Sequence, residues 1–209
     1  MEAELEKALR RVDVIGTPIT ATNMRDFLSM LQDSFDSFRG QYVCVSNAHT
    51  CVMAHDDPEY WEVQSSSIAS LPDGKPLSVI GRREVPTMGR VTGPDLMREV
   101  FALSERNGWS HYFYGNERRN LDALAEALGE RYPGLRVVGM EPSLFRPLSE
   151  TEEDEVVRNI RESGADFAWV ALGAPRQEIF CHRLRGRTDS LMVGVGGSGQ
   201  VGGEAHVTQ

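Results

Sequence analysis

The sequence of 209 residues lacks a long apolar segment, paired cysteines and any excess of positive charge. No apolar run has the length of a bilayer-spanning helix, and the first residues have neither the basic start nor the apolar core of a signal peptide. The three cysteines, Cys44, Cys51 and Cys181, are odd in number and have no metal-ligand spacing, which is typical of reduced thiols. We therefore expect a cytoplasmic protein that does not span the membrane.

The chain is acidic, with a formal net charge of -9 and a pI near 5.1. Its average field repels nucleic acid, so a polyanionic partner would need a strong local basic patch. The small candidate is the cluster of Arg82, Arg83 and Arg90. It suits one phosphate or pyrophosphate group rather than a duplex, and a solvated basic loop is the alternative. We expect no nucleic-acid partner.

Two common nucleotide-binding motifs are missing. Gly-x-Gly-x-x-Gly does not follow an early strand, and no acidic residue stands at the distance expected of a ribose ligand. A Walker loop is absent, and the glycine-rich segment 194–199 has no capped amphipathic helix after it. An NAD-dependent oxidoreductase would therefore rest on fold analogy alone.

What the sequence does have is an alternation of strand-like and helix-like segments. Ser149 with Glu152 forms a capping box, and several other helices begin at residues that cap well. Strands alternating with helices predict an α/β, Rossmann-like fold: a mostly parallel sheet of about six strands with helices on both faces. We expect one domain over residues 1–196 and a flexible, glycine-rich tail over 197–209. The predicted strands are 42–45, 77–80, 111–114, 136–140, 166–172 and 191–195, and helices are predicted to begin at Asn23, Thr92, Asn116, Ser149 and the 173–175 turn.

Small or polar residues follow three of the predicted strands, at 46–47, 115–116 and 173–178. Ligands of α/β folds bind at the carboxyl ends of the strands, where the following helix starts present free amides to phosphate oxygens. Glycines that only make tight strand-to-helix turns are the alternative. Three such ends in one sheet favour a ligand such as a nucleotide diphosphate.

A carboxylate stands in the turn Leu-Pro-Asp-Gly at 71–74. An ordinary Pro-Asp-Gly turn explains the pattern by itself. A sugar hydroxyl that attacks an anomeric carbon needs a base, however, and Asp73 is the usual type of group for that work. His49 and His55 compete for this role, although each fits a packed or surface histidine.

Several segments together resemble the WecG/TagA/CpsF glycosyltransferases, also known as glycosyltransferase family 26. The specific combination is Leu-Pro-Asp-Gly at 71–74, Arg-Val-Thr-Gly at 90–93 and Gly-Ala-Pro-Arg-Gln-Glu at 173–178, supported by segments 42–50, 112–115 and 193–197. The resemblance covers residues 12 to about 197. It implies a metal-independent, inverting transferase without a cofactor. The donor would be a UDP-linked sugar of the N-acetylmannosamine type. The acceptor would be a polyprenyl-pyrophosphate-linked saccharide of cell-surface polysaccharide synthesis, at the cytoplasmic face of the membrane.

The resemblance also implies roles for individual residues. Asp73 looks like the general base, and Arg90 and Gln177 look like catalytic groups that contact the donor or its pyrophosphate. Val45 replaces a threonine found in many relatives, so the role of that hydroxyl is not carried over. The implied substrate-binding residues are Ser46, Asn47, Thr92, Gly115, Asn116, Gly139, Met140, Gly173, Ala174, Pro175 and Glu178.

The C-terminal segment departs from the family pattern. Gln200 stands where relatives have an aspartate, and the basic, aromatic appendage that follows in relatives is not found in this sequence. Without that covering segment we expect donor binding with weak turnover. The alternative is a UDP-sugar-binding or oligomerising module that does not catalyse transfer, and a homo-oligomer would cover apolar surface left open.

Overall fold

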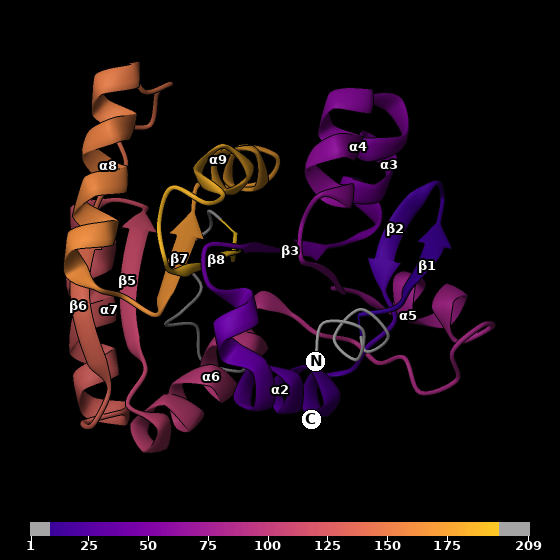
Figure 1. The fold of residues 1–209 in the computed structure, drawn as a ribbon, viewed down its shortest axis with the longest axis horizontal. Helices are drawn as coiled ribbons and strands as arrows, with labels where there is room; N and C mark the ends of the chain where they lie inside the picture. Colours follow the sequence, from indigo (N-terminus) through magenta and orange to yellow (C-terminus); the bar gives the residue numbers. More distant parts are fainter. Residues whose placement is uncertain (1–8, 197–209) are drawn as a thin grey trace, which may run out of the picture.

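The computed structural model describes residues 9–196, and its centre is a six-stranded, all-parallel sheet with the order β4-β3-β8-β7-β5-β6 (Figure 1). This confirms the predicted α/β architecture. The predicted segment 197–209, which includes Gln200, lies outside the described residues. The strands are β3 Tyr42–Ser46, β4 Ala69–Pro72, β5 Ser110–Gly115, β6 Arg136–Glu141, β7 Phe167–Ala171 and β8 Leu191–Gly194.

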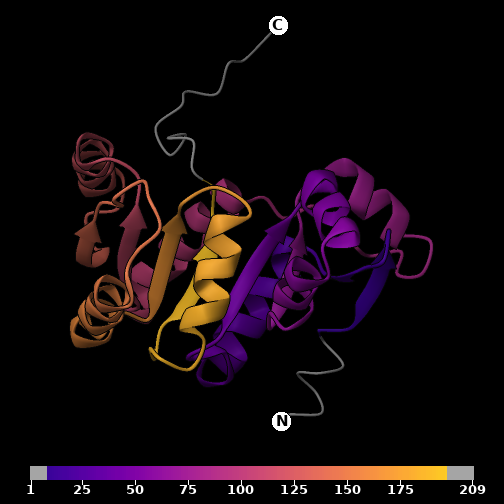
Figure 2. The same cartoon turned by 90° about the horizontal axis from the view of Figure 1, so that it is seen from above.

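Helices cover both faces of the sheet because its central strands carry apolar side chains on both sides. One face packs against α2 (Met24–Ser34), α6 (Gly93–Asn107) and α7 (Arg118–Arg131), and the short 3-10 helix η1 (Phe35–Phe38) continues α2. The other face packs against α4 (Pro58–Ser65), α8 (Glu150–Ser163) and α9 (Arg176–Leu184). In Figure 1, α4 and α9 lie above the sheet and α2 and α6 below it. Seen from above, α9, drawn in yellow, lies over the middle strands (Figure 2).

An antiparallel hairpin, β1 (Arg11–Val14) with β2 (Thr17–Thr20), forms a small second sheet that the sequence patterns did not predict. The backbone amide of Ser70 donates to the Thr20 hydroxyl at 2.9 Å, which ties the hairpin to the edge strand β4. Two further helices, α3 (Ala48–Asp56) and α5 (Lys75–Gly81), pack against the hairpin in a separate apolar cluster.

The predicted caps explain where several helices begin. Asn23 accepts from the amide of Asp26 at the start of α2, and Thr92 accepts from the amide of Asp95 at the start of α6. Ser149 and Glu152 form the predicted capping box of α8. In the described part of the chain, no helix has the length and apolar character needed to cross a bilayer.

Two local predictions were wrong. Residues 77–80 form part of helix α5 rather than a strand, because Leu77 and Ile80 are spaced so that both contact the hairpin cluster from one side of a helix. The strand comes earlier, as β4, and ends directly before Asp73. Asn116 does not cap α7: its φ is 65°, in the left-handed region, whereas an N-cap residue is extended, and Glu117 takes that position.

Candidate active site

The loop that follows β4 and the segment 173–178 face one cavity of about 110 Å3 at the carboxyl edge of the sheet. Asp73 and the Gly-Ala-Pro-Arg-Gln-Glu turn must face the same cavity if both are to contact one ligand. The strands β3, β4 and β8 are neighbours, so the loops after them meet at this edge. The lining residues are Val45, Asn47, Thr50, Asp73, Gly93, Pro94, Ala174, Gln177, Glu178, Gly194, Val195 and Gly196.

Asp73 is held by the backbone and lies next to Arg90. Its amide donates to the carbonyl of Ser46 at 2.7 Å, which joins the ends of β4 and β3. The amide of Val91 donates to the carbonyl of Pro72 at 2.9 Å, and this bond brings the segment carrying Arg90 alongside. The Asp73 Oδ1 to Arg90 Nε distance is 3.6 Å.

The environment of Asp73 suits a general base. Burial raises the pKa of its carboxyl above the ordinary value, and the positive charge of Arg90 opposes that shift. The side chain is 29% exposed, so it reaches the cavity without being fully solvated. A carboxylate with a raised pKa accepts a proton more readily, which is the property required of a base.

Gln177 is almost fully buried and holds two loops together. Its Oε1 accepts from the amides of Gly173 at 3.2 Å and Gly196 at 2.9 Å. Its Nε2 donates to Oε1 of Glu178 at 2.8 Å. A carboxamide has two N–H donors, so one N–H remains for a ligand. The structure therefore shows Gln177 chiefly as a support for the cavity wall.

Glu178 is only 1% exposed, and its Oε2 has no hydrogen-bond partner among residues 9–196. Burial raises the pKa of its carboxyl, and the hydrogen bond from Gln177 opposes that shift. Burial and the Glu178 carboxylate both raise the pKa of Tyr60, whose hydroxyl accepts from Gln64 Nε2 at 2.8 Å. An unpartnered carboxylate oxygen in a cavity wall is costly unless a proton or a ligand satisfies it.

Ser46 supports the site through buried hydrogen bonds. Its side chain is fully buried, and its hydroxyl lies 2.7 Å from both Gln64 Oε1 and Ser70 Oγ. It therefore joins the ends of β3 and β4, which differs from the predicted direct contact with substrate. The sequence patterns did not single out Gln64 or Ser70, because a buried amide in a helix carries no motif.

Two of the predicted ligand-binding residues cap helices at the cavity. Asn47 and Thr50 form a capping box at the start of α3, and both line the cavity. The Asn47 side-chain oxygen accepts from the Thr50 amide at 3.1 Å, which leaves the carboxamide nitrogen for a ligand. Thr92 caps α6, and Gly93 and Pro94 after it line the cavity. The spacing of Asn47 and Thr50 was the sequence signal that could have added Thr50 to the site.

Four predicted residues, Gly115, Asn116, Gly139 and Met140, lie away from Asp73. They belong to β5, its following loop and β6, and β5 is four strands from β4, which precedes Asp73, or roughly 19 Å. A Cβ on Gly115 would lie 2.5 Å from the carbonyl oxygen of Ala171, so close packing against β7 explains this glycine. A Cβ on Gly139 would clash with the ring of Tyr112.

Arg82, of the predicted basic cluster, does not line the cavity. Arg82 donates through Nε to the carbonyl of Met88 at 2.8 Å, so it supports its own loop. Over the described range 9–196, no group of three or more His, Cys, Asp or Glu side chains is placed to hold a metal ion.

The fold and the cavity define an α/β protein with a carboxylate and a guanidinium at the carboxyl edge of a parallel sheet. The model of the glycosyl transferase WecG/TagA/CpsF family matches residues 12–204, and the chain belongs to this family. Two similar relatives are both named N-acetylglucosaminyldiphosphoundecaprenol N-acetyl-beta-D-mannosaminyltransferase. The relative from Bacillus spizizenii is 26% identical over 195 residues, which are 92% of this chain and 72% of the relative. The relative from Bacillus subtilis is 25% identical over 184 residues, which are 87% of this chain and 70% of the relative.

Proposed function

We propose that this chain transfers an N-acetylhexosamine from a UDP-linked donor to a saccharide carried on a polyprenyl diphosphate, with inversion at the anomeric carbon. The observation that carries the proposal is the cavity shared by Asp73 and the segment 173–178. The names of the two relatives support a mannosamine-type sugar and a diphosphoundecaprenol-linked acceptor. The protein would work at the cytoplasmic face of the membrane, where such an acceptor is reached.

In the proposed reaction, Asp73 takes the proton from an acceptor hydroxyl. The hydroxyl oxygen forms a bond to the anomeric carbon on the face opposite the diphosphate. The bond from that carbon to the diphosphate oxygen breaks, and its electron pair leaves with UDP. Arg90, whose side chain is 59% exposed, has the freedom to turn from Asp73 toward the departing diphosphate and stabilise its charge.

The donor would extend along the edge of the sheet. A cavity of about 110 Å3 is smaller than the roughly 300–1,000 Å3 typical of a complete small-molecule site, so only part of the donor fits beside Asp73. The sugar would lie there, and the nucleoside would point toward Gly115, Asn116 and Met140. The positive helix starts and Arg90 would take the place of a metal ion at the diphosphate.

Calorimetric titration tests the donor class. UDP, UDP-N-acetylglucosamine, UDP-N-acetylmannosamine and NADH are each titrated into the purified chain, and transfer to a lipid-linked N-acetylglucosamine acceptor is measured in parallel. We expect binding of UDP and of at least one UDP-sugar, with transfer of that sugar. Binding of NADH without UDP would contradict the proposal. UDP binding with no transfer would instead identify a nucleotide-sugar-binding module.

A further inference from the structure

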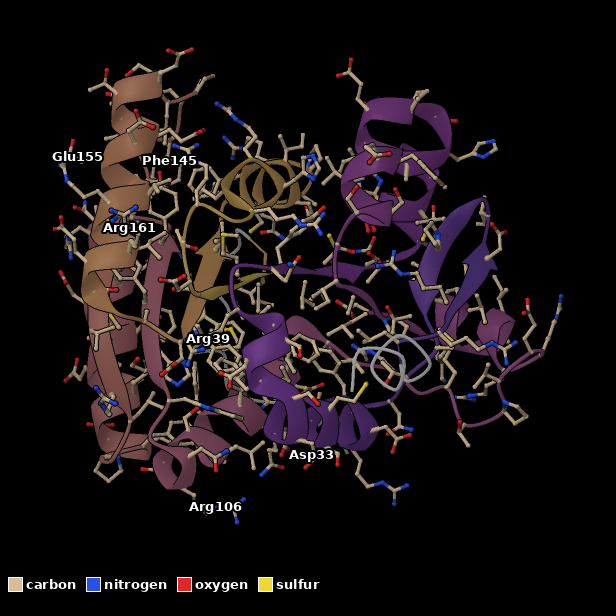
Figure 3. The ribbon with its side chains drawn as sticks, in the orientation of Figure 1. Asp33, Arg39, Arg106, Phe145, Glu155 and Arg161 are labelled. Atoms are coloured by element: carbon tan, nitrogen blue, oxygen red, sulfur yellow. The ribbon has the colours of Figure 1, made fainter. Side chains whose placement is uncertain are left out.

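A second cavity, of about 670 Å3, lies between α8, α9 and the segment 143–148. This volume falls in the range typical of small-molecule sites, roughly 300–1,000 Å3. Figure 3 labels Phe145 at this place, between α8 and α9. Of the residues predicted to bind substrate, Gly173 lines this cavity.

The walls of this cavity are largely apolar, and apolar side chains also surround its opening. Leu144, Phe145 and Ile179 are 52%, 58% and 38% exposed. Phe145 has a φ of 53°, in the left-handed region that bulky residues rarely adopt and that is found preferentially at binding sites. Deeper in the cavity, the rings of Tyr114 and Phe180 stack with their centroids 5.0 Å apart. Apolar groups gathered around one opening mark a surface for an apolar ligand.

The same cavity is locally cationic in a chain whose net charge is -9. Arg146, Arg176 and Arg183 line it, together with the carboxylate of Glu153. Arg146 is paired with Glu152 at 2.6 Å. Glu153 is already paired with Arg183 at 2.8 Å and with Arg187 at 2.8 Å. Arg176 donates to the carbonyl of Leu172 at 2.9 Å, and no carboxylate in the described part of the chain is paired with it. A ligand that is both apolar and anionic complements this lining.

The first turn of α9 separates this cavity from the one that holds Asp73. Gly173, Arg176 and Ile179 line the larger cavity, whereas Ala174 and Gln177 line the smaller one. One helical turn advances only about 5.4 Å, so a single extended molecule can occupy both. The start of α9 therefore borders both cavities, and the positive end of its helix dipole favours a phosphate group there, although the amide of Gln177 already donates to the carbonyl of Gly173 at 3.1 Å.

We propose that the cavity between α8 and α9 binds the diphosphate and the first isoprene units of the lipid-linked acceptor, and so points its saccharide toward Asp73. This inference rests on the proposed function. Arg176 and the start of α9 hold the diphosphate, and the apolar wall holds the prenyl chain. The exposed side chains Leu144, Phe145 and Ile179 then lie where the chain passes toward the bilayer.

The other possible occupant is the uridine of the donor. A uracil ring is recognised through hydrogen bonds to its polar edge, which includes an N–H that needs an acceptor. Glu153, the carboxylate in this lining, is already shared between two arginines. A prenyl chain needs only apolar area, which this cavity provides.

Titration of the full chain with farnesyl diphosphate, in the presence and absence of saturating UDP, tests this assignment. Ile179→Glu and Leu144→Glu place a negative charge at the opening on exposed positions, so folding should be retained. Val79→Glu is the matched control, because Val79 is 53% exposed on α5 and does not line the cavity. We expect both opening variants to weaken farnesyl diphosphate about tenfold or more, which corresponds to a loss of at least one buried apolar contact. UDP affinity should stay within twofold in all three variants.

Three results would overturn the assignment. The first is competition between UDP and farnesyl diphosphate with loss of UDP affinity in Ile179→Glu, which would place the nucleotide here. The second is equal binding of inorganic pyrophosphate and farnesyl diphosphate, which would remove the apolar contribution. The third is UDP binding without any farnesyl diphosphate binding. Absence of UDP binding by the unaltered chain is a separate result, which would remove the proposed function itself.

Discussion

Arg90 Nε lies 3.6 Å from Oδ1 of Asp73, so the proposed base and the cation proposed to stabilise the leaving group form an ion pair. Burial raises the pKa of Asp73, and the charge of Arg90 opposes that shift. If donor binding draws Arg90 toward the diphosphate, Asp73 loses this partner and its pKa rises. The base would then become stronger when the donor is in place.

Asp73→Asn removes the proton acceptor and keeps the shape of the side chain. We expect kcat/KM for sugar transfer to fall by about 10²–10⁴-fold, the usual contribution of a general base. UDP affinity should be almost unchanged, since the base contacts the acceptor hydroxyl. Initial rates with calorimetry for UDP check both parts, and full activity in the variant would remove Asp73 from the mechanism.

Arg90→Gln removes the charge that opposes the effect of burial on Asp73. The pKa of Asp73 should therefore rise further above its ordinary value. Because the base works only when deprotonated, activity falls as the pH drops through this pKa, and in the variant the fall should begin at a higher pH. At pH values above this pKa, the rate should also drop by about 10²–10³-fold, as when one donor to a developing negative charge is lost. The pH profile of kcat/KM measures both, and an unchanged acidic limb would contradict the pairing.

Glu178→Gln tests how the ionisation of the buried Glu178 carboxyl changes the free energy of unfolding. Burial raises the pKa of Glu178 in the folded chain, so the folded state holds its proton to a higher pH than the unfolded state does. The stability from the protonated form is complete below the unfolded pKa and is lost as the pH rises through the folded pKa. Unfolding in urea at pH 5 and pH 8 measures this. The free energy of unfolding of the variant should rise relative to that of the unaltered chain between pH 5 and pH 8.

Glu162→Gln is the matched control for that measurement, since Glu162 is an exposed residue of α8. The difference in free energy of unfolding between this control variant and the unaltered chain should be the same at the two pH values. An equal pH response in the two variants would show that burial of Glu178 is not the cause.

The architecture could be predicted from the sequence where local signals and packing agree. The strand 42–45 and the capping box of Ser149 with Glu152 were predicted because a short β-branched and aromatic run and a helix cap are local properties. The strand predicted for 77–80 was wrong because a four-residue segment with three apolar residues fits a strand or a helix, and its helical state depends on contacts with the distant hairpin. That hairpin was itself missed, since its strands are only four residues each.

The site was predictable in part for the same reason. Asp73, Asn47 and Gln177 were found by their motifs, and the structure brings them to one cavity. The buried support from Gln64 and Ser70 joins residues of a helix and a strand, and the sequence around each has no pattern that marks it. The larger cavity depends on the irregular segment 143–148, which has no periodicity to read.

Gly115→Ala tests whether this glycine is needed for packing. Its φ is 114°, and an added Cβ would lie 2.5 Å from the carbonyl oxygen of Ala171. Backbone of β5 and β7 would have to move apart, and we expect a loss of about 1–3 kcal/mol in the free energy of unfolding. Gly129→Ala is the matched control: Gly129 lies in α7, has no heavy atom within 4 Å of an added Cβ, and should stabilise the chain by about 0.5–1 kcal/mol. Urea unfolding of both variants compares them. A Gly115→Ala chain as stable as the unaltered one would show that the glycine is kept for the ligand, and loss of UDP affinity without loss of stability would then locate the nucleotide at this strand end.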